Sequence, residues 1–434
     1  MFLARLLVLF SLVCISCAHS SFEQKQLKHA LDFATSNRLE LEILLQHYTY
    51  DSLKLEAAKF LIRNMPHCYS YQQGGEMDSV KRVRTYYSPF GQIDQTYARR
   101  WGHYTYRNLP KIYDAHIITA EYLIDNIDRA FDNWQKRPWN RSLSFEDFCE
   151  YLLPYRIGDE PLEEWRELYE KKYGYLLDSI YKGSDVVEAA NLVSRHLQEP
   201  VFIYCEDFEL PHIGPRYLFS HRYGSCVDAA DIVTYAFRAV GIPCMEDTDA
   251  RGGHVWNVVR DTTGRDVPIW YIASEAVRGS RDTGGYKRGK VYRPMYGFQE
   301  EKAAHLGDDW KSMPLLFYHP YMKDVSYAYY PDTLRILTGI PDDEVCYLAH
   351  FHEAHWWSCA CARSASGKME IPNLESELVY LPIKYTKGNY YPSGFPFWFA
   401  GGEINTFLPD WEKTVKVRLY RKYPVYGWLR SFMG

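Results

Sequence analysis

Two short segments decide the fold: Gly224-Ser-Cys-Val-Asp-Ala-Ala230 and Gly252-Gly-His-Val-Trp-Asn257. In the first segment the serine can cap a helix, which we predict to run from Cys226 to Val240 before a Gly-Ile-Pro stop. In the second segment the histidine opens a β-like run of alternating residues. The sequence therefore predicts a helix that begins on a cysteine, followed by a strand that begins on a histidine.

The residue types at these two positions indicate thiol chemistry. The free N–H groups and the dipole at a helix N-terminus stabilise negative charge, so this position favours the thiolate of Cys226. His254, with a tryptophan two residues further on, can face such a helix start and take the thiol proton. Alone, each residue is more often structural. Their order and spacing together make Cys226 a candidate nucleophile and His254 its candidate base.

Together the two segments resemble the transglutaminase-like superfamily. That superfamily pairs a Gly-x-Cys helix start with a Gly-His-x-Trp strand, followed by a carboxylate on the next strand. The resemblance implies a papain-like core in which Cys226, His254 and an acidic residue act together.

The acidic residue is the part of the pattern that this sequence matches least well. The superfamily commonly has Asp in a Trp-x-x-x-Asp-Pro pattern, and the corresponding run here is Trp270-Tyr-Ile-Ala-Ser-Glu-Ala276. We expect Glu275 to be the third member, since a carboxylate of either length can orient an imidazole. Asp261 and Asp266 stay open as alternatives, although both fall in the expected turn between two strands. Glu275 can equally be a residue that only closes a strand.

Four further segments extend the resemblance to exported Bacteroidetes transglutaminase-like proteins, lipoproteins among them. These segments are Asp51–Pro66, Tyr151–Arg156, Lys290–Arg293 and Arg421–Pro424. That group combines a helical N-terminal region, a transglutaminase-like core and a C-terminal β-domain. Its longer members continue past the Arg-Lys-Tyr-Pro element, so we expect an abbreviated C-terminal domain here.

Apolar residues recur at helical spacing through the first half of the chain, which predicts a helical region over residues 22–198. Its clearest helices are expected at 52–63, 120–134 and 160–173. Residues 70–110 are rich in Gly, Tyr and Arg and show weak periodicity, so they predict an extended loop.

Short β-like runs follow from about residue 200 onward. Residues 199–280 form the expected core, and a Gly- and Arg-rich segment from 278 to 290 predicts a linker or surface loop. Alternating runs separated by turns then predict an antiparallel β-sandwich over residues 290–434. Strands are expected there at 345–351, 356–362, 378–382 and 414–420. The predicted fold class is therefore α+β, with a helical N-terminal region, a papain-like core and a C-terminal antiparallel β-sandwich.

Residues 1–17 predict an export signal. A basic start precedes an apolar run of ten residues, Leu6 to Ile15, which is too short to span a bilayer. The run leads into Cys14-Ile-Ser-Cys-Ala18, which resembles a bacterial lipobox except that a cysteine replaces the usual aliphatic residue. We expect a lipid on Cys17 to anchor an outer-membrane or cell-surface lipoprotein, with the periplasm as second choice. The alternative is simple cleavage near Ala18.

Composition narrows the range of partners. The net charge of −5 gives no support for a nucleic-acid partner, which requires a basic patch or stripe. Aromatic residues make up 16% of the chain, which suits the β-surfaces of an exported protein but does not establish glycan binding. No motif indicates a cofactor. The cysteines beyond Cys14 and Cys17 are too scattered to reveal a disulfide pairing.

A group of histidines and cysteines invites a zinc interpretation. The group comprises His350, His352, His355, Cys359 and Cys361. Their spacing matches neither a Cys-x-x-Cys pair nor a helical His-Glu-x-x-His pair. A β-hairpin, on which residues two apart share a face, explains the spacing better, and we expect no metal site.

These features predict an exported thiol-dependent acyl-transfer enzyme that acts on peptide or carboxamide bonds. Hydrolysis is favoured over transfer to an amine because water is in excess outside the cell. A peptide or protein is the expected substrate, and a glycan is a further candidate partner. The alternative function is a non-catalytic surface protein that binds peptide or glycan on the same scaffold. Three tryptophans, Trp356, Trp357 and Trp398, motivate this alternative.

Overall fold

The computed structural model describes residues 22–87, 106–199, 201–204, 210–251, 253–270, 272, 274–281, 287–299, 313–337, 342, 344–352 and 355–413. Helices and antiparallel sheets are combined in the chain, so the α+β prediction is confirmed. The predicted export signal and the predicted strand at 414–420 lie outside the described residues, as does the Arg421–Pro424 element. Of the helices described, none has the length and apolar character that crossing a membrane requires.

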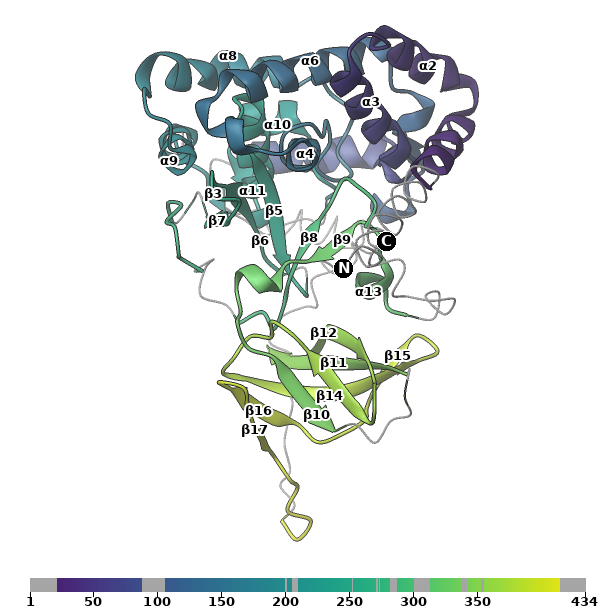
Figure 1. The fold of residues 1–434 in the computed structure, drawn as a ribbon, viewed down its shortest axis with the longest axis vertical. Coiled ribbons are helices and arrows are strands. Elements are labelled where there is room, and N and C mark those ends of the chain that lie inside the picture. The colour runs from purple at the N-terminus through teal and green to yellow at the C-terminus, as the bar shows by residue number, and fades with distance from the viewer. Residues whose placement is uncertain are drawn as a thin grey trace, which may run out of the picture. The chain divides into compact units, whose positions relative to one another are not determined.

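The chain divides into two compact units (Figure 1). Unit 1 comprises Met1–Ser184, Leu210–His221 and Tyr235–Pro243, and unit 2 comprises Asp185–Glu209, Arg222–Thr234 and Cys244–Gly434.

Unit 1 is mainly helical. A helical stretch over residues 22–33 precedes its named helices. These are α2 (Arg38–His47), α3 (Ser52–Asn64), α4 (Gly75–Tyr87), α6 (Ala120–Lys136), α7 (Phe145–Tyr151), α8 (Arg166–Tyr175) and α10 (Pro215–Ser220). A short antiparallel pair, β1 (Tyr69–Tyr71) with β2 (Lys111–Tyr113), also lies in this unit.

Local sequence signals explain where α3 and α6 begin. The side chain of Asp51 accepts a hydrogen bond from the backbone N–H of Lys54, and Thr119 caps α6 in the same way. Both helices then bury one apolar stripe, which includes Leu61 of α3 and Leu123 of α6, each with no exposed surface. Burial of one such leucine contributes about 1.5–3 kcal/mol to stability.

Two predictions for this region were wrong. The expected loop over 70–110 contains helix α4, which begins on Gly75 directly after Gly74, both at positive φ. Its Met77 is fully buried. The helix expected from residue 160 begins only at Arg166. The Glu160 carboxylate instead accepts hydrogen bonds from two preceding backbone N–H groups, which holds this segment in a turn.

Unit 2 is built on a five-stranded antiparallel sheet in the order β7-β6-β5-β8-β9. Its strands are β5 (Cys244–Asp249), β6 (Val255–Arg260), β7 (Asp266–Ile269), β8 (Val291–Pro294) and β9 (Met322–Asp324). Helix α9 (Val186–Leu197) and a parallel pair, β3 (Ile203–Tyr204) with β4 (Tyr223–Gly224), also belong to this unit. Helix α11 (Cys226–Ala239) matches the predicted helix to within a residue, and its part up to Thr234 lies in unit 2.

The C-terminal part of unit 2 contains a six-stranded antiparallel sheet and a separate two-stranded one. The larger sheet has the order β12-β11-β14-β16-β17, with β15 paired to β14. These strands are β11 (Val345–His352), β12 (His355–Arg363), β14 (Leu378–Thr386), β15 (Asn389–Pro392), β16 (Phe397–Ala400) and β17 (Glu403–Thr406). The smaller sheet pairs β10 (Leu334–Leu337) with β13 (Lys368–Ile371), and a short helix, α13 (Leu315–Tyr318), precedes both.

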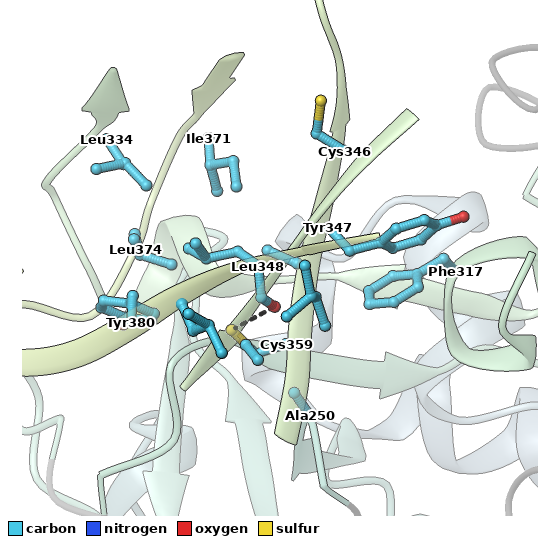
Figure 2. Packing of buried hydrophobic residues seen from close by; sticks show 14 of the residues in the cluster. Ala250, Phe317, Leu334, Cys346, Tyr347, Leu348, Cys359, Ile371, Leu374 and Tyr380 are labelled. Carbon is cyan, nitrogen blue, oxygen red and sulfur yellow. Dashed lines mark hydrogen bonds between the residues drawn. The ribbon is translucent and has the colours of Figure 1, made fainter. Parts of the chain in front are cut away.

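One apolar core serves both of these sheets (Figure 2). Leu334 and Ile371 of the small sheet belong to the same buried cluster as Leu348 and Tyr380 of the large sheet. Cys359, also in this cluster, directs its thiol at the Leu348 carbonyl oxygen, 3.4 Å away. The expected strands at 345–351, 356–362 and 378–382 are thus present. The first two are slightly longer than predicted, and the third continues to Thr386.

Candidate functional site

Cys226 is the first residue of α11, and the start of this helix is fixed by its own sequence. Gly224 has a φ of 153°, which favours glycine. The backbone N–H of Ser225 donates a hydrogen bond to Asp228 Oδ2 over 2.8 Å, and its hydroxyl donates to the same oxygen over 3.1 Å. This arrangement resembles a capping box in which Asp replaces Glu. The side chain of Cys226 is 2% exposed.

Helix α11 is joined to strand β6 by a buried amide. Asn257 Nδ2 donates to the Ala230 carbonyl oxygen over 3.1 Å and contacts Thr234 Oγ1 at 2.9 Å. Thr234 in turn donates to Glu246 on the neighbouring strand β5 over 2.7 Å. The first two turns of the helix are therefore held against the sheet that His254 adjoins.

His254 directly precedes strand β6 and is 7% exposed. Its ring stacks on the indole of Trp256, with 5.6 Å between centroids, and meets the indole of Trp270 edge to face at 4.6 Å. Its carbonyl oxygen accepts hydrogen bonds from the backbone N–H of Asp249 and from the Thr248 hydroxyl. Both the backbone and the ring of His254 are thus held in place.

The connection between helix and strand joins the two elements that carry the candidate residues, both within unit 2. Cys226 precedes Ala230 by one helical turn, about 6 Å along the axis. His254 precedes Asn257 by three residues, about 10 Å along an extended strand. Side chains alternate along β6, so Asn257 faces α11 while the His254 ring lies on the Trp256 side. Stacking uses the faces of the imidazole and leaves its nitrogens at the ring edge for hydrogen bonds.

A buried polar chain lies behind Trp256. The indole Nε1–H donates to the Tyr329 hydroxyl over 2.9 Å, and that hydroxyl donates to Asp247 Oδ2 over 2.7 Å. The Arg293 guanidinium donates to both oxygens of Asp247 and to Asp266 Oδ2. Burial raises the pKa of Tyr329 well above its ordinary value, so the hydroxyl keeps the proton that it donates.

These polar partners were not identified from the sequence. Asp247 has no exposed surface and Tyr329 is 3% exposed, although both residue types are often found at protein surfaces. They are 82 residues apart in the chain, so no local pattern links them. The only available signal is that Asp247 is a carboxylate within strand β5, which is buried at every position.

The structure gives Glu275 a partner on the surface. Its Oε1 accepts a hydrogen bond from Arg195 Nη1 of α9 over 2.6 Å, and both side chains are about half exposed. The next residue, Ala276, exchanges two hydrogen bonds with the side chain of Asn191 on the same helix. The structure therefore brings Glu275 to α9, while His254 packs against two indoles.

The two alternative acids also have structural partners. Asp261 Oδ1 accepts hydrogen bonds from Thr263 and Arg265 in the β6–β7 turn, and Oδ2 accepts one from Arg278. These contacts lower the pKa of the Asp261 carboxyl, against an opposing contribution from burial that is the largest single one. Asp266 is the first residue of β7 and pairs with Arg260 and with Arg293. The hairpin expected between the two strands is present.

The histidines and cysteines of the expected hairpin lie on β11 and β12. The pairs His352–His355 and Tyr347–Cys361 are in register, which confirms the hairpin. Within the described residues, no group of three or more His, Cys, Asp or Glu side chains could hold a metal ion. The cysteines that are described form no disulfide bond with one another.

The walls of two cavities are formed by side chains other than those of the candidate residues Cys226 and His254. One of about 290 Å³ lies in unit 1 between α6 and α8, and Trp165 and Arg166 are part of its wall. The other, of about 180 Å³, lies in the C-terminal part of unit 2 and is mostly apolar, with Tyr347 and Phe397 in its wall. Neither wall includes Cys226 or His254.

Exposed aromatic rings form a row across the larger sheet. Trp356 of β12 stands opposite Phe351 of β11, with 5.1 Å between ring centroids. Extending the β11–β14 register by one residue places Phe351 opposite Val379, which itself stands opposite Trp398 of β16. The three rings are 40%, 46% and 38% exposed. Trp357 points to the other face and donates to the His352 carbonyl oxygen.

Comparison with known proteins gives no relative: no family model, no curated protein and no solved structure matches this chain.

Proposed function

We propose that this protein is an exported, thiol-dependent acyl-transfer enzyme that cleaves peptide or carboxamide bonds on a transglutaminase-like core, followed by a β-sandwich. One observation carries the proposal. Helix α11, which begins on Cys226, is hydrogen-bonded through Asn257 to the strand that begins directly after His254. The two residue types that thiol catalysis needs thus lie at the ends of two elements that are fixed to each other.

The reaction uses Cys226 as the nucleophile. His254 takes the thiol proton, the sulfur attacks the carbonyl carbon, and a C–S bond forms. Collapse of the tetrahedral intermediate breaks the C–N bond, and the amine leaves with the proton from His254. Water then attacks the thioester, a C–O bond forms and the C–S bond breaks, which releases a carboxylic acid and restores the thiol. The helix-start N–H of Cys226 can donate to the oxyanion.

The geometry supports a dyad rather than a triad that includes Glu275. A catalytic acid acts by accepting a hydrogen bond from the imidazole. The Glu275 carboxylate is instead half exposed and bound to Arg195, as part of the segment that attaches to α9. In this proposal the orientation of His254 comes from the indoles of Trp256 and Trp270.

Cleavage of a peptide and carboxamide library tests the proposal. Wild-type protein is compared with Cys226→Ala and with Cys361→Ala, which removes a partly exposed thiol on β12. The expected result is cleavage that Cys226→Ala abolishes and Cys361→Ala leaves intact. Cleavage that survives Cys226→Ala, or a wild-type protein that cleaves nothing in the library, contradicts the proposal.

Export is a separate part of the proposal, supported by the apolar run and the lipobox-like sequence before Cys17. A lipid on Cys17 would hold the protein at the outer membrane or cell surface. Fractionation of cells that express wild-type protein or Cys17→Ser checks this. Wild-type protein in the membrane fraction and the variant in the soluble fraction are expected, and equal distribution of the two contradicts it.

The second candidate function is glycan binding by the aromatic row on the larger sheet. Exposed flat rings bind the apolar faces of sugar rings, and Phe351 and Trp398 lie two strands apart, about 9.5 Å. A glycan array probed with wild-type protein, Trp398→Ala and Cys226→Ala tests it. Binding that only Trp398→Ala loses favours this function, and wild-type protein that binds no glycan removes it.

A further inference from the structure

The buried chain behind Trp256 reaches a segment far from either sequence motif. Tyr329 lies in the turn after β9, where it directly follows the short helix Ser326–Ala328. Its hydroxyl accepts the hydrogen bond of the Trp256 indole and donates its own proton to Asp247. A single hydroxyl thus links strand β6 to strand β5 on the face where the His254 ring lies.

The position of Asp247 is fixed independently of Tyr329. Arg293 of β8 binds it through two nitrogens and also binds Asp266 of β7. Four strands of the five-stranded sheet therefore contribute to the network, and the side chain of every member is nearly or fully buried. Such a network resists rotation of its side chains because each lost hydrogen bond leaves a buried polar group unsatisfied, at about 1–3 kcal/mol.

The Trp256 indole contacts two further side chains through its ring. The His254 ring stacks on it at an interplanar angle of 29°, and the Arg288 guanidinium lies 4.8 Å from the ring centroid. Rotation of the indole would therefore move the surface against which the imidazole rests. Its Nε1–H bond to Tyr329 is the directional contact that sets this rotation.

We infer that Tyr329 is a positioning residue for the candidate base: it fixes the Trp256 indole, and through it the His254 imidazole, by its hydrogen bonds to Trp256 and Asp247. The effect of this positioning on the reactivity of Cys226 rests on the proposed function. The geometry of the chain from Asp247 to His254 does not depend on that function.

The test compares Tyr329→Phe with Tyr155→Phe in the full chain. The control removes a phenol hydroxyl of unit 1, which donates to the Asp114 carboxylate over 3.0 Å. Both variants thus lose a buried hydrogen bond to a carboxylate, and a purely structural effect would appear in both. Asp247→Asn, which keeps the side-chain volume, serves as a second variant if Tyr329→Phe does not fold.

Two measurements are made on each protein. One is the pH dependence of Cys226 alkylation by iodoacetamide, followed by mass spectrometry of the Cys226 peptide. The other is the NMR titration of the His254 ring in protein labelled with ¹³C-histidine. For Tyr329→Phe we expect both midpoints to move by at least about half a pH unit, with alkylation at pH 7 slowed about threefold or more. Tyr155→Phe should match wild type in both.

The inference is overturned if Tyr329→Phe gives the same His254 titration as wild type and Tyr155→Phe. Failure of the proposed function looks different. In that case His254→Ala leaves the alkylation profile of Cys226 unchanged, while the NMR titration of His254 still reports whether Tyr329 positions the ring.

Discussion

Asn257 on β6 donates a hydrogen bond to the carbonyl oxygen of Ala230 on α11 over 3.1 Å, one helical turn after the candidate nucleophile. The same amide contacts Thr234 Oγ1, and its side chain has no exposed surface. This single residue therefore fixes the first two turns of the helix to the sheet.

Replacement of Asn257 should weaken the attachment of α11 to β6. We expect Asn257→Ala to lower the free energy of unfolding by about 2 kcal/mol, because it leaves the Ala230 carbonyl without its partner and opens a small cavity. Urea denaturation measures the change. Asn389→Ala, at the exposed start of β15, is the control and should unfold like wild type. An Asn257→Ala protein as stable as the control would show that the bridge does not hold the helix.

A buried ion pair stabilises unit 1. Arg156 binds both carboxylate oxygens of Asp114, and both side chains are almost fully buried. Asp114→Ala should lower the free energy of unfolding by about 3–5 kcal/mol, since it leaves the Arg156 guanidinium buried with the weaker partner Glu160 nearby. The matched control is Glu370→Ala, which breaks the exposed pair with Arg335 and should change stability by less than about 1 kcal/mol. Equal losses in a denaturant titration would contradict this account.

His350 makes the protein sensitive to acid. It has no exposed surface, and neither ring nitrogen has a hydrogen-bond partner among the described residues. Burial lowers its pKa to about 3, assisted by the charges of Arg251 and His352 and opposed by Asp249. Between pH 3 and the ordinary value of about 6.5 the unfolded chain binds a proton that the native chain does not, so stability falls with falling pH.

The contribution of this histidine is about 2 kcal/mol at pH 5 relative to pH 8. His350→Leu should therefore flatten the pH dependence of the unfolding midpoint by that amount across this range. His355→Leu, which removes an exposed histidine from the same hairpin, should leave the dependence unchanged. The same slope in wild type and His350→Leu would show that the ring is protonated or solvated in the native state.

The surface ion pair of Glu275 leads to a prediction about catalysis. Glu275→Gln removes the charge that binds Arg195 but keeps the side-chain shape, so stability should change by less than about 1 kcal/mol. Alkylation of Cys226 should proceed as in wild type. A fall in the alkylation rate as large as that caused by His254→Ala would restore Glu275 as the third member of the site.

Local signals explain which elements could be predicted from the sequence. Ser225 and Asp228 cap α11 through contacts within three residues, and the hairpin between β6 and β7 follows from alternation around a short turn. Helix α4 was missed because its stability depends on distant packing. Met77 belongs to one buried cluster with Tyr71 and Tyr106, which lie outside the helix.

The candidate site likewise combines features set by local sequence with features set by long-range contacts. Its two motifs are each a few residues long and could be found in the sequence, whereas their surroundings depend on long-range pairing. Asp247 meets Arg293 and Tyr329 only because β5 pairs with β8 in the folded sheet. Glu275 was selected by its position after a tryptophan. Its ion pair with Arg195, 80 residues earlier, depends on how α9 packs and cannot be read from spacing.

The most direct test of the central claim is the alkylation rate of each thiol in the intact protein. Exposure alone predicts that iodoacetamide labels the partly exposed Cys361 faster than Cys226, which is 2% exposed. A nucleophile–base pair predicts the opposite order at pH 7, and a loss of the Cys226 rate in His254→Ala with Cys361 unaffected. Labelling of Cys226 that is slower than that of Cys361 and indifferent to His254→Ala would contradict the account.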